Sequence, residues 1–81
     1  MTSLTMQNAK APCGIEIRVG QVWCKVGRCH DSGCHFVVNK IETHRGQDLV
    51  LLLFRPGDHF WCSLDEFHGK RNGYKLVRNV A

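Results

Sequence analysis

The sequence predicts a mainly β fold, a small antiparallel domain of short strands, and three observations indicate it. The stretch at residues 48–54, an apolar run that begins after Asp48, has the length of a strand and is too short for a buried helix or a membrane span. Shorter segments on both sides of this run alternate apolar and polar residues, which is the period of a strand. Turn signals separate the segments, above all Pro56-Gly57 and Asn72-Gly73.

The predicted elements follow one another in a simple order. Residues 1–14 are mostly small and polar without periodicity, so we expect a flexible tail followed by one folded domain over residues 15–81. Residues 15–19 extend the first strand or form a strand of their own. Ser63 and Glu66 have capping-box spacing, which predicts one helical turn before the last strand. The main strands are expected at residues 21–26, 36–42 (kinked where the alternation slips at Asn39-Lys40), 49–54, 59–64 and 74–78.

Length, cysteine content and hydropathy limit the class of protein. A chain of 81 residues forms one domain with a small core. Its five cysteines are an odd number, which argues against a secreted framework of fully paired disulfides and favours reduced thiols. The sequence contains no recognisable signal peptide or membrane span. We therefore expect a cytoplasmic protein that does not enter a membrane.

The net charge of +4 arises at one end of the chain. Bases and acids balance over residues 1–68, whereas residues 69–81 contain Lys70, Arg71, Lys75 and Arg78 and no acid. A basic strip of this kind can meet phosphates or an acidic protein. Lysine and arginine also protect edge strands from aggregation, so a purely solubilising role is the alternative.

The apolar run is unusual because both of its faces are apolar. Leu49, Leu51 and Leu53 face one way in a strand, and Val50, Leu52 and Phe54 face the other way. One set can fill the core, and the other needs a cover from the N-terminal segment, a second subunit or a foreign partner. We expect Val50, Leu52 and Phe54 to form the partner or dimer face.

A Trp-Cys dipeptide occurs in two of the predicted strands, at residues 23–24 and 61–62. If both cysteines point inward, Trp23 and Trp61 lie on the outer face and offer a stacking platform for bases or a partner. The alternative is that at least one of the two tryptophans is a core residue.

Residues of zinc-ligand type cluster at positions 29–35. Zinc takes four tetrahedral ligands, usually in two separated pairs, whereas this cluster consists of two adjacent Cys-His dipeptides without a distant second pair. Two free thiols, a Cys29–Cys34 disulfide and a zinc site formed by Cys29, His30, Cys34 and His35 are the alternatives. Adjacent Cys and His do not supply the oriented base that a thiolate nucleophile requires. We expect neither catalysis nor a cofactor.

The order of the elements resembles the SH3-like small β-barrel shared by SH3, Tudor and KOW domains. The segment Val19-Gly20-Gln21-Val22-Trp23 and the ending Leu64, Phe67 and Gly73-Tyr74-Lys75-Leu76-Val77 also resemble small bacterial and phage proteins of this fold. The resemblance covers about residues 17–78. It implies a five-stranded barrel that binds DNA, RNA, peptides or proteins and is not an enzyme.

These observations favour a small binding module that engages nucleic acid or a nucleoprotein complex. One alternative is a phage or mobile-element protein that inhibits a host complex, such as a defence system, by protein–protein binding. A small zinc-binding structural domain is a second alternative, and a homodimer is a further expected assembly. The residues expected to bind nucleic acid or a partner are Trp23, Lys25, Arg28, Arg55, Trp61, Lys70, Arg71, Lys75 and Arg78.

Overall fold

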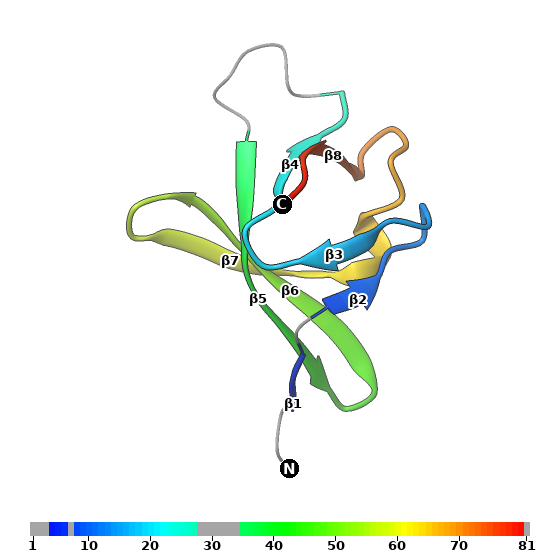
Figure 1. The fold of residues 1–81 in the computed structure, drawn as a ribbon, viewed down its shortest axis with the longest axis vertical. Helices are drawn as coiled ribbons and strands as arrows, with labels where there is room; N and C mark the ends of the chain where they lie inside the picture. Colours follow the sequence, from blue (N-terminus) through cyan, green and yellow to red (C-terminus); the bar gives the residue numbers. More distant parts are fainter. Residues whose placement is uncertain (1–3, 7, 28–34, 81) are drawn as a thin grey trace.

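The computed structural model describes residues 4–6, 8–27 and 35–80 (Figure 1). None of the helical segments in these ranges is long and apolar enough to span a membrane. The elements are β1 (Leu4–Met6), β2 (Asn8–Lys10), β3 (Glu16–Arg18), β4 (Val22–Lys25), β5 (His35–His44), β6 (Gln47–Arg55), β7 (Asp58–Ser63), the 3-10 turn η2 (Leu64–Glu66) and β8 (Tyr74–Arg78).

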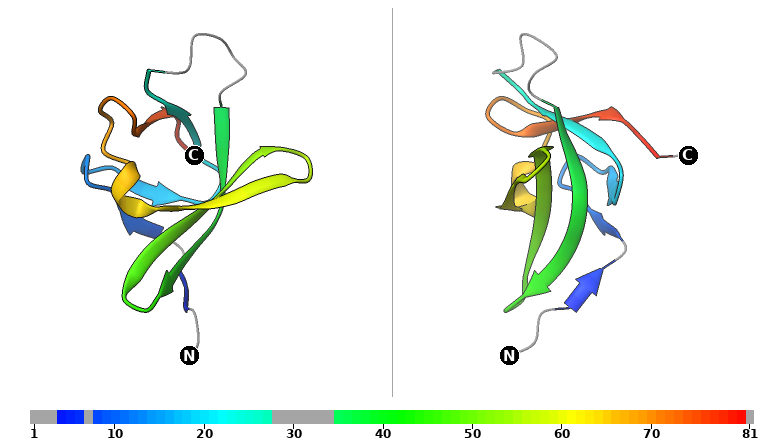
Figure 2. Two further views of the ribbon diagram at one scale, coloured as in Figure 1. Left: turned by 180° about the vertical axis from the view of Figure 1, so that it is seen from behind. Right: turned by 90° about the vertical axis from the view of Figure 1, so that its left-hand side faces the viewer.

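Most of the strands form one antiparallel sheet. Its strand order is β7-β6-β5-β4-β8, and β1 pairs with the C-terminal part of β5. β2 and β3 form a separate hairpin. The large sheet is strongly twisted, so that the β5–β6 turn and the β6–β7 turn point in different directions (Figures 1 and 2). β7 and β8 end this order without pairing with each other in the described chain, so these strands form an open sheet and not a closed barrel.

The structure confirms the mainly β class and the five main strands, which correspond to β4 through β8. The β5–β6 pairing shifts register between Val38 and Lys40, so the predicted kink is a β-bulge. At the start of η2, the side-chain oxygen of Ser63 accepts a hydrogen bond from the backbone N–H of Asp65 at 3.3 Å, as its predicted capping role requires. Gly57 has a φ of 86°, which fits the predicted Pro-Gly turn.

The N-terminal segment differs from the flexible tail that the sequence predicts. β1 pairs with residues 41–43 of β5, and β2 pairs with β3. Ala9 and Ala11 are buried in the core. Alanine side chains and three-residue strands are too small to produce a readable hydrophobic alternation. Periodicity therefore does not reveal that this segment contributes to the core.

The side of β6 that faces the core is the one that the sequence analysis assigns to a partner. Val50 and Leu52 are fully buried, so their prediction as part of a partner or dimer face is wrong. Both belong to one core cluster with Ile17 of β3 and with Phe67, which follows η2. The β2–β3 hairpin and the η2 segment thus contribute to the cover on this side of β6. The other side of β6 carries Leu49, Leu51 and Leu53.

Trp23 is also a core residue, so its prediction as an exposed stacking residue is wrong. Its side chain is fully buried, and its ring meets that of Phe67 edge to face with 5.1 Å between the centroids. Its indole N–H donates a hydrogen bond to Oε1 of the fully buried Gln21 at 3.1 Å. The strand alternation leaves the inward face of β4 undecided, whereas these two partners place Trp23 inside.

Candidate functional site

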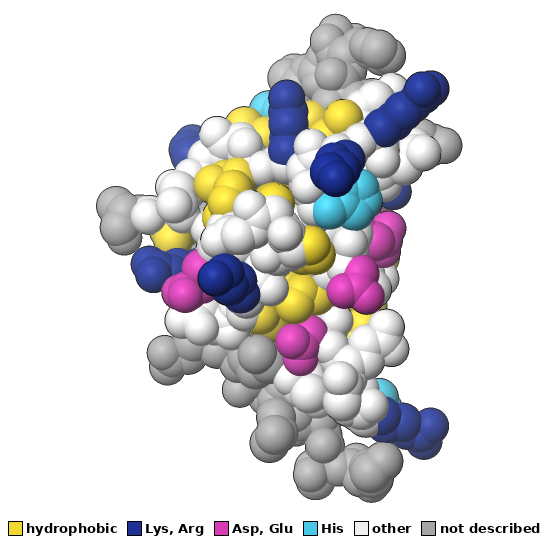
Figure 3. Space-filling model, turned by 90° about the vertical axis from the view of Figure 1, so that its right-hand side faces the viewer, with side chains coloured by type: hydrophobic (Ala, Val, Ile, Leu, Met, Phe, Trp, Pro, Cys, Tyr) yellow, Lys and Arg dark blue, Asp and Glu magenta, His cyan; other side chains and the backbone are white. Residues whose placement is uncertain are grey.

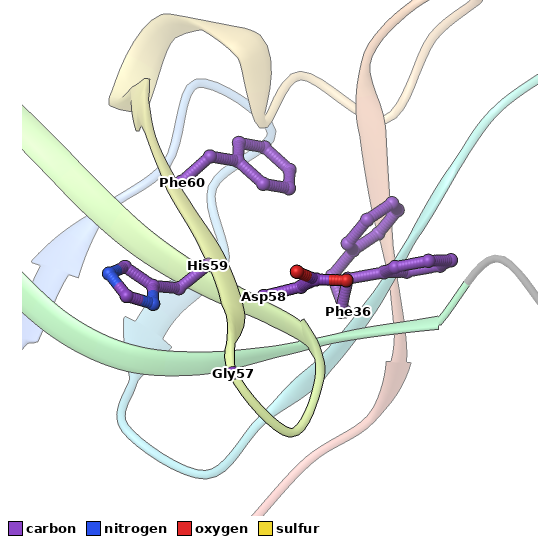
Figure 4. A pocket seen from close by; sticks show the side chains of 6 residues that line it. Phe36, Gly57, Asp58, His59 and Phe60 are labelled. Atoms are coloured by element: carbon purple, nitrogen blue, oxygen red, sulfur yellow. The ribbon is translucent and has the colours of Figure 1, made fainter.

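An open aromatic pocket lies at the end of the β6–β7 hairpin. It has a volume of about 490 Å³ and is lined by Phe36, Phe54, Gly57, Asp58, His59 and Phe60 (Figure 4). The ring centroid of Phe36 lies 5.5 Å from that of Phe54 and 5.6 Å from that of Phe60. Phe54 and Phe60 remain 42% and 38% exposed, so aromatic surface at this pocket is accessible to a ligand.

Three strands position the aromatic side chains of this pocket. Phe36 lies near the start of β5, Phe54 near the end of β6, and Phe60 within β7. Phe60 pairs with Leu52, whose side chain is in the core, so Phe60 extends the core side of the sheet towards the hairpin end. Figure 4 shows Phe60 and Asp58 on one side of β7 and His59 on the other.

A row of aromatic rings connects the pocket with the core. The ring of Phe36 also meets that of Tyr74 at 5.6 Å between centroids, and Tyr74 stacks on Phe67 at 4.9 Å. Phe67 in turn contacts Trp23. Because the inner rings are buried, they hold the ring of Phe36 in position at the pocket.

Two basic side chains accompany the aromatic row. The Arg55 guanidinium carbon lies 5.4 Å from the ring centroid of Phe54, and its Nε donates to Oδ2 of Asp58. The carboxylate of Asp58 is thereby neutralised at the rim of the pocket. Lys25 Nζ lies 5.1 Å from the ring centroid of Tyr74 and 3.8 Å from Oε1 of Glu66.

A second pocket adjoins the first at the tip of the hairpin. Its volume is about 370 Å³, and it shares Phe54 and Gly57 with the first pocket. Its other lining residues are Val37, Leu53, Arg55 and Pro56. The two pockets give the hairpin tip an extended apolar surface with the Arg55–Asp58 ion pair at its rim.

The predicted basic strip at the C-terminal end of the chain is exposed. Lys70, Arg71, Lys75 and Arg78 are all exposed, the first two in the loop before β8 and the others in β8. This loop is attached to the end of β4, since the backbone N–H of Val26 donates to the carbonyl oxygen of Gly73 at 2.8 Å. Figure 3 shows Lys and Arg side chains gathered beside a histidine at the upper end of one face, with Asp and Glu side chains below them.

The remaining predicted site residues have different outcomes. Trp61 is 44% exposed, but it alternates with Phe60 along β7 and so lies on the opposite face from the aromatic pocket. Arg28 lies outside the described residues, as do Cys29, His30 and Cys34 of the zinc alternative. His35 is exposed. Within the described ranges, no three His, Cys, Asp or Glu side chains are grouped as a metal site.

Most of the pocket is not predictable from the sequence pattern. The pattern places Phe54 on a partner face and gives no indication of Phe36, Asp58, His59 and Phe60 as site residues. A signal for two of the pocket residues does exist, because Phe54 and Phe60 flank the Pro56-Gly57 turn, and a tight hairpin places both of them near its end. The approach of Phe36 depends on which residues of β5 and β6 pair, and the sequence indicates only the kink at Asn39-Lys40 and not this pairing.

The described cysteines have different environments. Cys24 is disulfide-bonded, in contrast to the reduced thiols that the odd cysteine count favours. An odd number of cysteines means that they cannot all be paired within one chain, but it does not exclude one disulfide bond. Cys13 is an exposed free thiol and Cys62 a buried one. Burial, reinforced by the charge of Glu66, raises the pKa of the Cys62 thiol from 9.0 to about 12.

We expect Cys62 to resist alkylation in the folded protein near pH 8, whereas Cys13 reacts. The raised pKa keeps the Cys62 thiol protonated, and only a thiolate reacts readily. This pKa lies above its value of 9.0 in an unfolded chain, so the stabilising contribution of the neutral thiol is complete below pH 9.0 and is lost as the pH rises towards about 12. Peptide mass mapping after iodoacetamide treatment measures both thiols. Equal modification of both cysteines would contradict this expectation.

No family model matches the chain, and neither a curated protein nor a solved structure shows significant similarity to it.

Proposed function

We propose that this protein is a non-enzymatic binding module that engages single-stranded nucleic acid through the aromatic pocket. One observation carries the proposal: the accessible rings of Phe54 and Phe60 line one open pocket, each in contact with Phe36, and the Arg55 guanidinium lies beside Phe54. Bases stack on aromatic side chains in a largely sequence-independent way, and basic side chains beside them meet the phosphates. An unpaired base can enter such a pocket, whereas a base inside a duplex cannot.

Basic groups elsewhere on the described chain support the same proposal. Lys25 lies along the aromatic row at Tyr74, from which β8 continues with the exposed Lys75 and Arg78. A strand whose bases occupy the pocket can therefore extend towards β8 and neutralise its phosphates there. The net charge of +4 favours approach of a polyanion.

An SH3-like architecture is part of this proposal. β4 to β7 are neighbours in sequence and in the sheet, β8 returns to pair with β4, and η2 lies shortly before β8. This strand order and the position of the turn support an SH3-like meander. Because likeness at the level of the fold does not establish a ligand, the pocket carries the functional argument.

Replacing Phe60 or Phe54 with alanine is expected to weaken binding of a fluorescent single-stranded oligonucleotide by roughly 5- to 150-fold, since one base–aromatic stack contributes about 1–3 kcal/mol. Fluorescence anisotropy at low salt with DNA and RNA probes measures the affinity. The matched control is Val19→Ala, which truncates an apolar side chain that is somewhat more exposed (49%) and does not line the pocket.

The salt dependence provides a second readout of the same experiment. If phosphates are bound, the logarithm of affinity falls linearly with the logarithm of salt concentration, and Arg55→Gln lowers the slope by about 0.7. Failure of both DNA and RNA probes to bind at low salt would overturn the proposal. Equal binding by the Phe60→Ala, Phe54→Ala and Val19→Ala variants would overturn the role of the pocket.

A further inference from the structure

Asp58 is the polar side chain that the aromatic pocket presents to a ligand. Among the lining residues of this pocket, Asp58 and His59 have polar side chains. Strand alternation places Asp58 on the same side of β7 as the Phe60 ring and His59 on the opposite side, as Figure 4 shows. The Asp58 side chain is 53% exposed, so its carboxylate is accessible to a base that stacks on the aromatic rings.

The ion pair with Arg55 orients this carboxylate and leaves most of its hydrogen-bonding capacity unused. Arg55 and Asp58 are cross-strand partners at the end of the hairpin, and Nε of Arg55 donates to Oδ2 of Asp58. No described residue donates to the other oxygen, Oδ1. A carboxylate has about four lone-pair sites, so several remain available to a ligand. The nearby guanidinium also offsets the repulsion between this carboxylate and a nucleic-acid strand.

The bases differ in what they present to such a group. An ionised carboxylate accepts hydrogen bonds and donates none. Guanine presents its ring N1–H and its 2-amino group side by side, so it can donate to both oxygens of a carboxylate. Adenine and cytosine present an amino group beside a ring-nitrogen acceptor, and thymine and uracil present a ring N–H between carbonyl oxygens. Guanine is therefore the base whose edge best matches the carboxylate of Asp58.

We propose that the aromatic pocket selects guanine and that Asp58 is the residue that determines this specificity. The rings of Phe54 and Phe60 supply the stacking surface, and the Asp58 carboxylate accepts hydrogen bonds from N1–H and the 2-amino group of the stacked base. Stacking on aromatic rings tolerates every base, so a preference has to come from the polar group. This inference rests on the proposed function and names the base that the pocket takes.

Fluorescence anisotropy at low salt with two matched DNA strands tests this inference. In one strand guanine alternates with thymine, and in the other hypoxanthine alternates with thymine. Hypoxanthine is guanine without the 2-amino group, so the two strands carry the same phosphates and similar ring systems. A hydrogen bond to a charged group contributes roughly tenfold or more in affinity, and guanine occupies every second position, so we expect the guanine strand to bind at least about threefold more tightly.

Asp58→Asn is expected to abolish the difference between the two strands while the affinity for the hypoxanthine strand stays the same or rises. The amide has a single acceptor oxygen, so it no longer accepts from both donors of guanine, and the loss of a negative charge favours binding of a polyanion. Damage to the fold would instead weaken binding of both strands. The matched control is Asp65→Asn, which removes the same charge at an exposed position of η2 outside the pocket and retains the preference.

The possible results separate this inference from the proposed function. Equal binding of the two strands by the wild-type protein would overturn the guanine preference, whereas the proposed function would stand because both strands are bound. A preference of the same size in Asp58→Asn as in the wild type would overturn the role of Asp58. Failure of both strands to bind, while another single-stranded probe binds, would overturn this inference alone. Failure of every DNA and RNA probe would overturn the proposed function as well.

Discussion

Leu52→Asp is expected to unfold this protein, whereas the same substitution at the adjacent Leu53 leaves it folded. The Leu52 side chain is fully buried within the core cluster, and Leu53 is half-buried on the other side of β6. A carboxylate at position 52 has no charged partner in the core, and burial of such a group costs more than about 4 kcal/mol. A domain of this size rarely has more than about 3–5 kcal/mol of stability from its core, so the loss exceeds what the fold can sustain.

Urea denaturation followed by circular dichroism measures this difference. Leu53→Asp is expected to lower the free energy of unfolding by about 1–2 kcal/mol, because it removes apolar contacts but leaves the carboxylate in contact with water. The two variants have the same composition and the same net charge, so each is the control for the other. A folded Leu52→Asp protein with the stability of Leu53→Asp would contradict the assignment of the core side of β6.

Gln21→Leu is expected to lower the free energy of unfolding by about 2–4 kcal/mol, although it replaces a polar core residue with an apolar one. The fully buried side chain of Gln21 makes four hydrogen bonds. Its Oε1 accepts from the backbone N–H of Arg18 at 2.7 Å and from the Trp23 indole N–H at 3.1 Å. Its Nε2 donates to the carbonyl oxygen of Glu16 at 2.9 Å and to Oδ1 of Asn79 at 2.8 Å. The substitution leaves these partners unsatisfied, and the indole group is the most deeply buried of them.

Gln47→Leu is the matched control for Gln21→Leu, since Gln47 is exposed at the start of β6. We expect this control to change the free energy of unfolding by less than about 0.5 kcal/mol. Thermal and urea denaturation, with the emission of the buried Trp23 as a second probe, give the two values. An unchanged stability of Gln21→Leu would show that the hydrogen-bond network does not hold β3, β4 and the C-terminal segment together.

Much of the β architecture is predictable from local sequence. β4 through β8 are visible because their residues alternate in polarity. In addition, Gly57 and the Asn72-Gly73 pair mark turns whose backbone conformations cost most other residues more energy. The capping role of Ser63 is likewise a local property of spacing. β1 and β2 are not visible, because each is only three residues long. β1 is moreover held by pairing with the distant strand β5.

The candidate site was less predictable than the strands. The exposure of the basic residues in the last strand follows from their charge, and the exposure of Trp61 agrees with one of the two orientations that the sequence allows. The pocket requires Phe36, Phe54 and Phe60 to converge from three strands. Their convergence depends on two register shifts, one in the β5–β6 pairing and one in the β6–β7 pairing. A shift of one residue moves a side chain to the opposite face. The alternation slip at Asn39-Lys40 marks the first shift, whereas no comparable slip marks the second, between Leu53 and Arg55.

By itself, the sequence determines that this chain forms short antiparallel strands around residues 48–54 and that both faces of this run are apolar. The tertiary structure alone decides that Val50 and Leu52 are core, that Leu51 is on the outer face, and that Trp23 is buried while Trp61 is exposed. A period of two divides a strand into two equivalent sets of side chains. Which set becomes the core depends on the side that the β2–β3 hairpin and the segment after η2 cover, and those contacts join residues far apart in the chain.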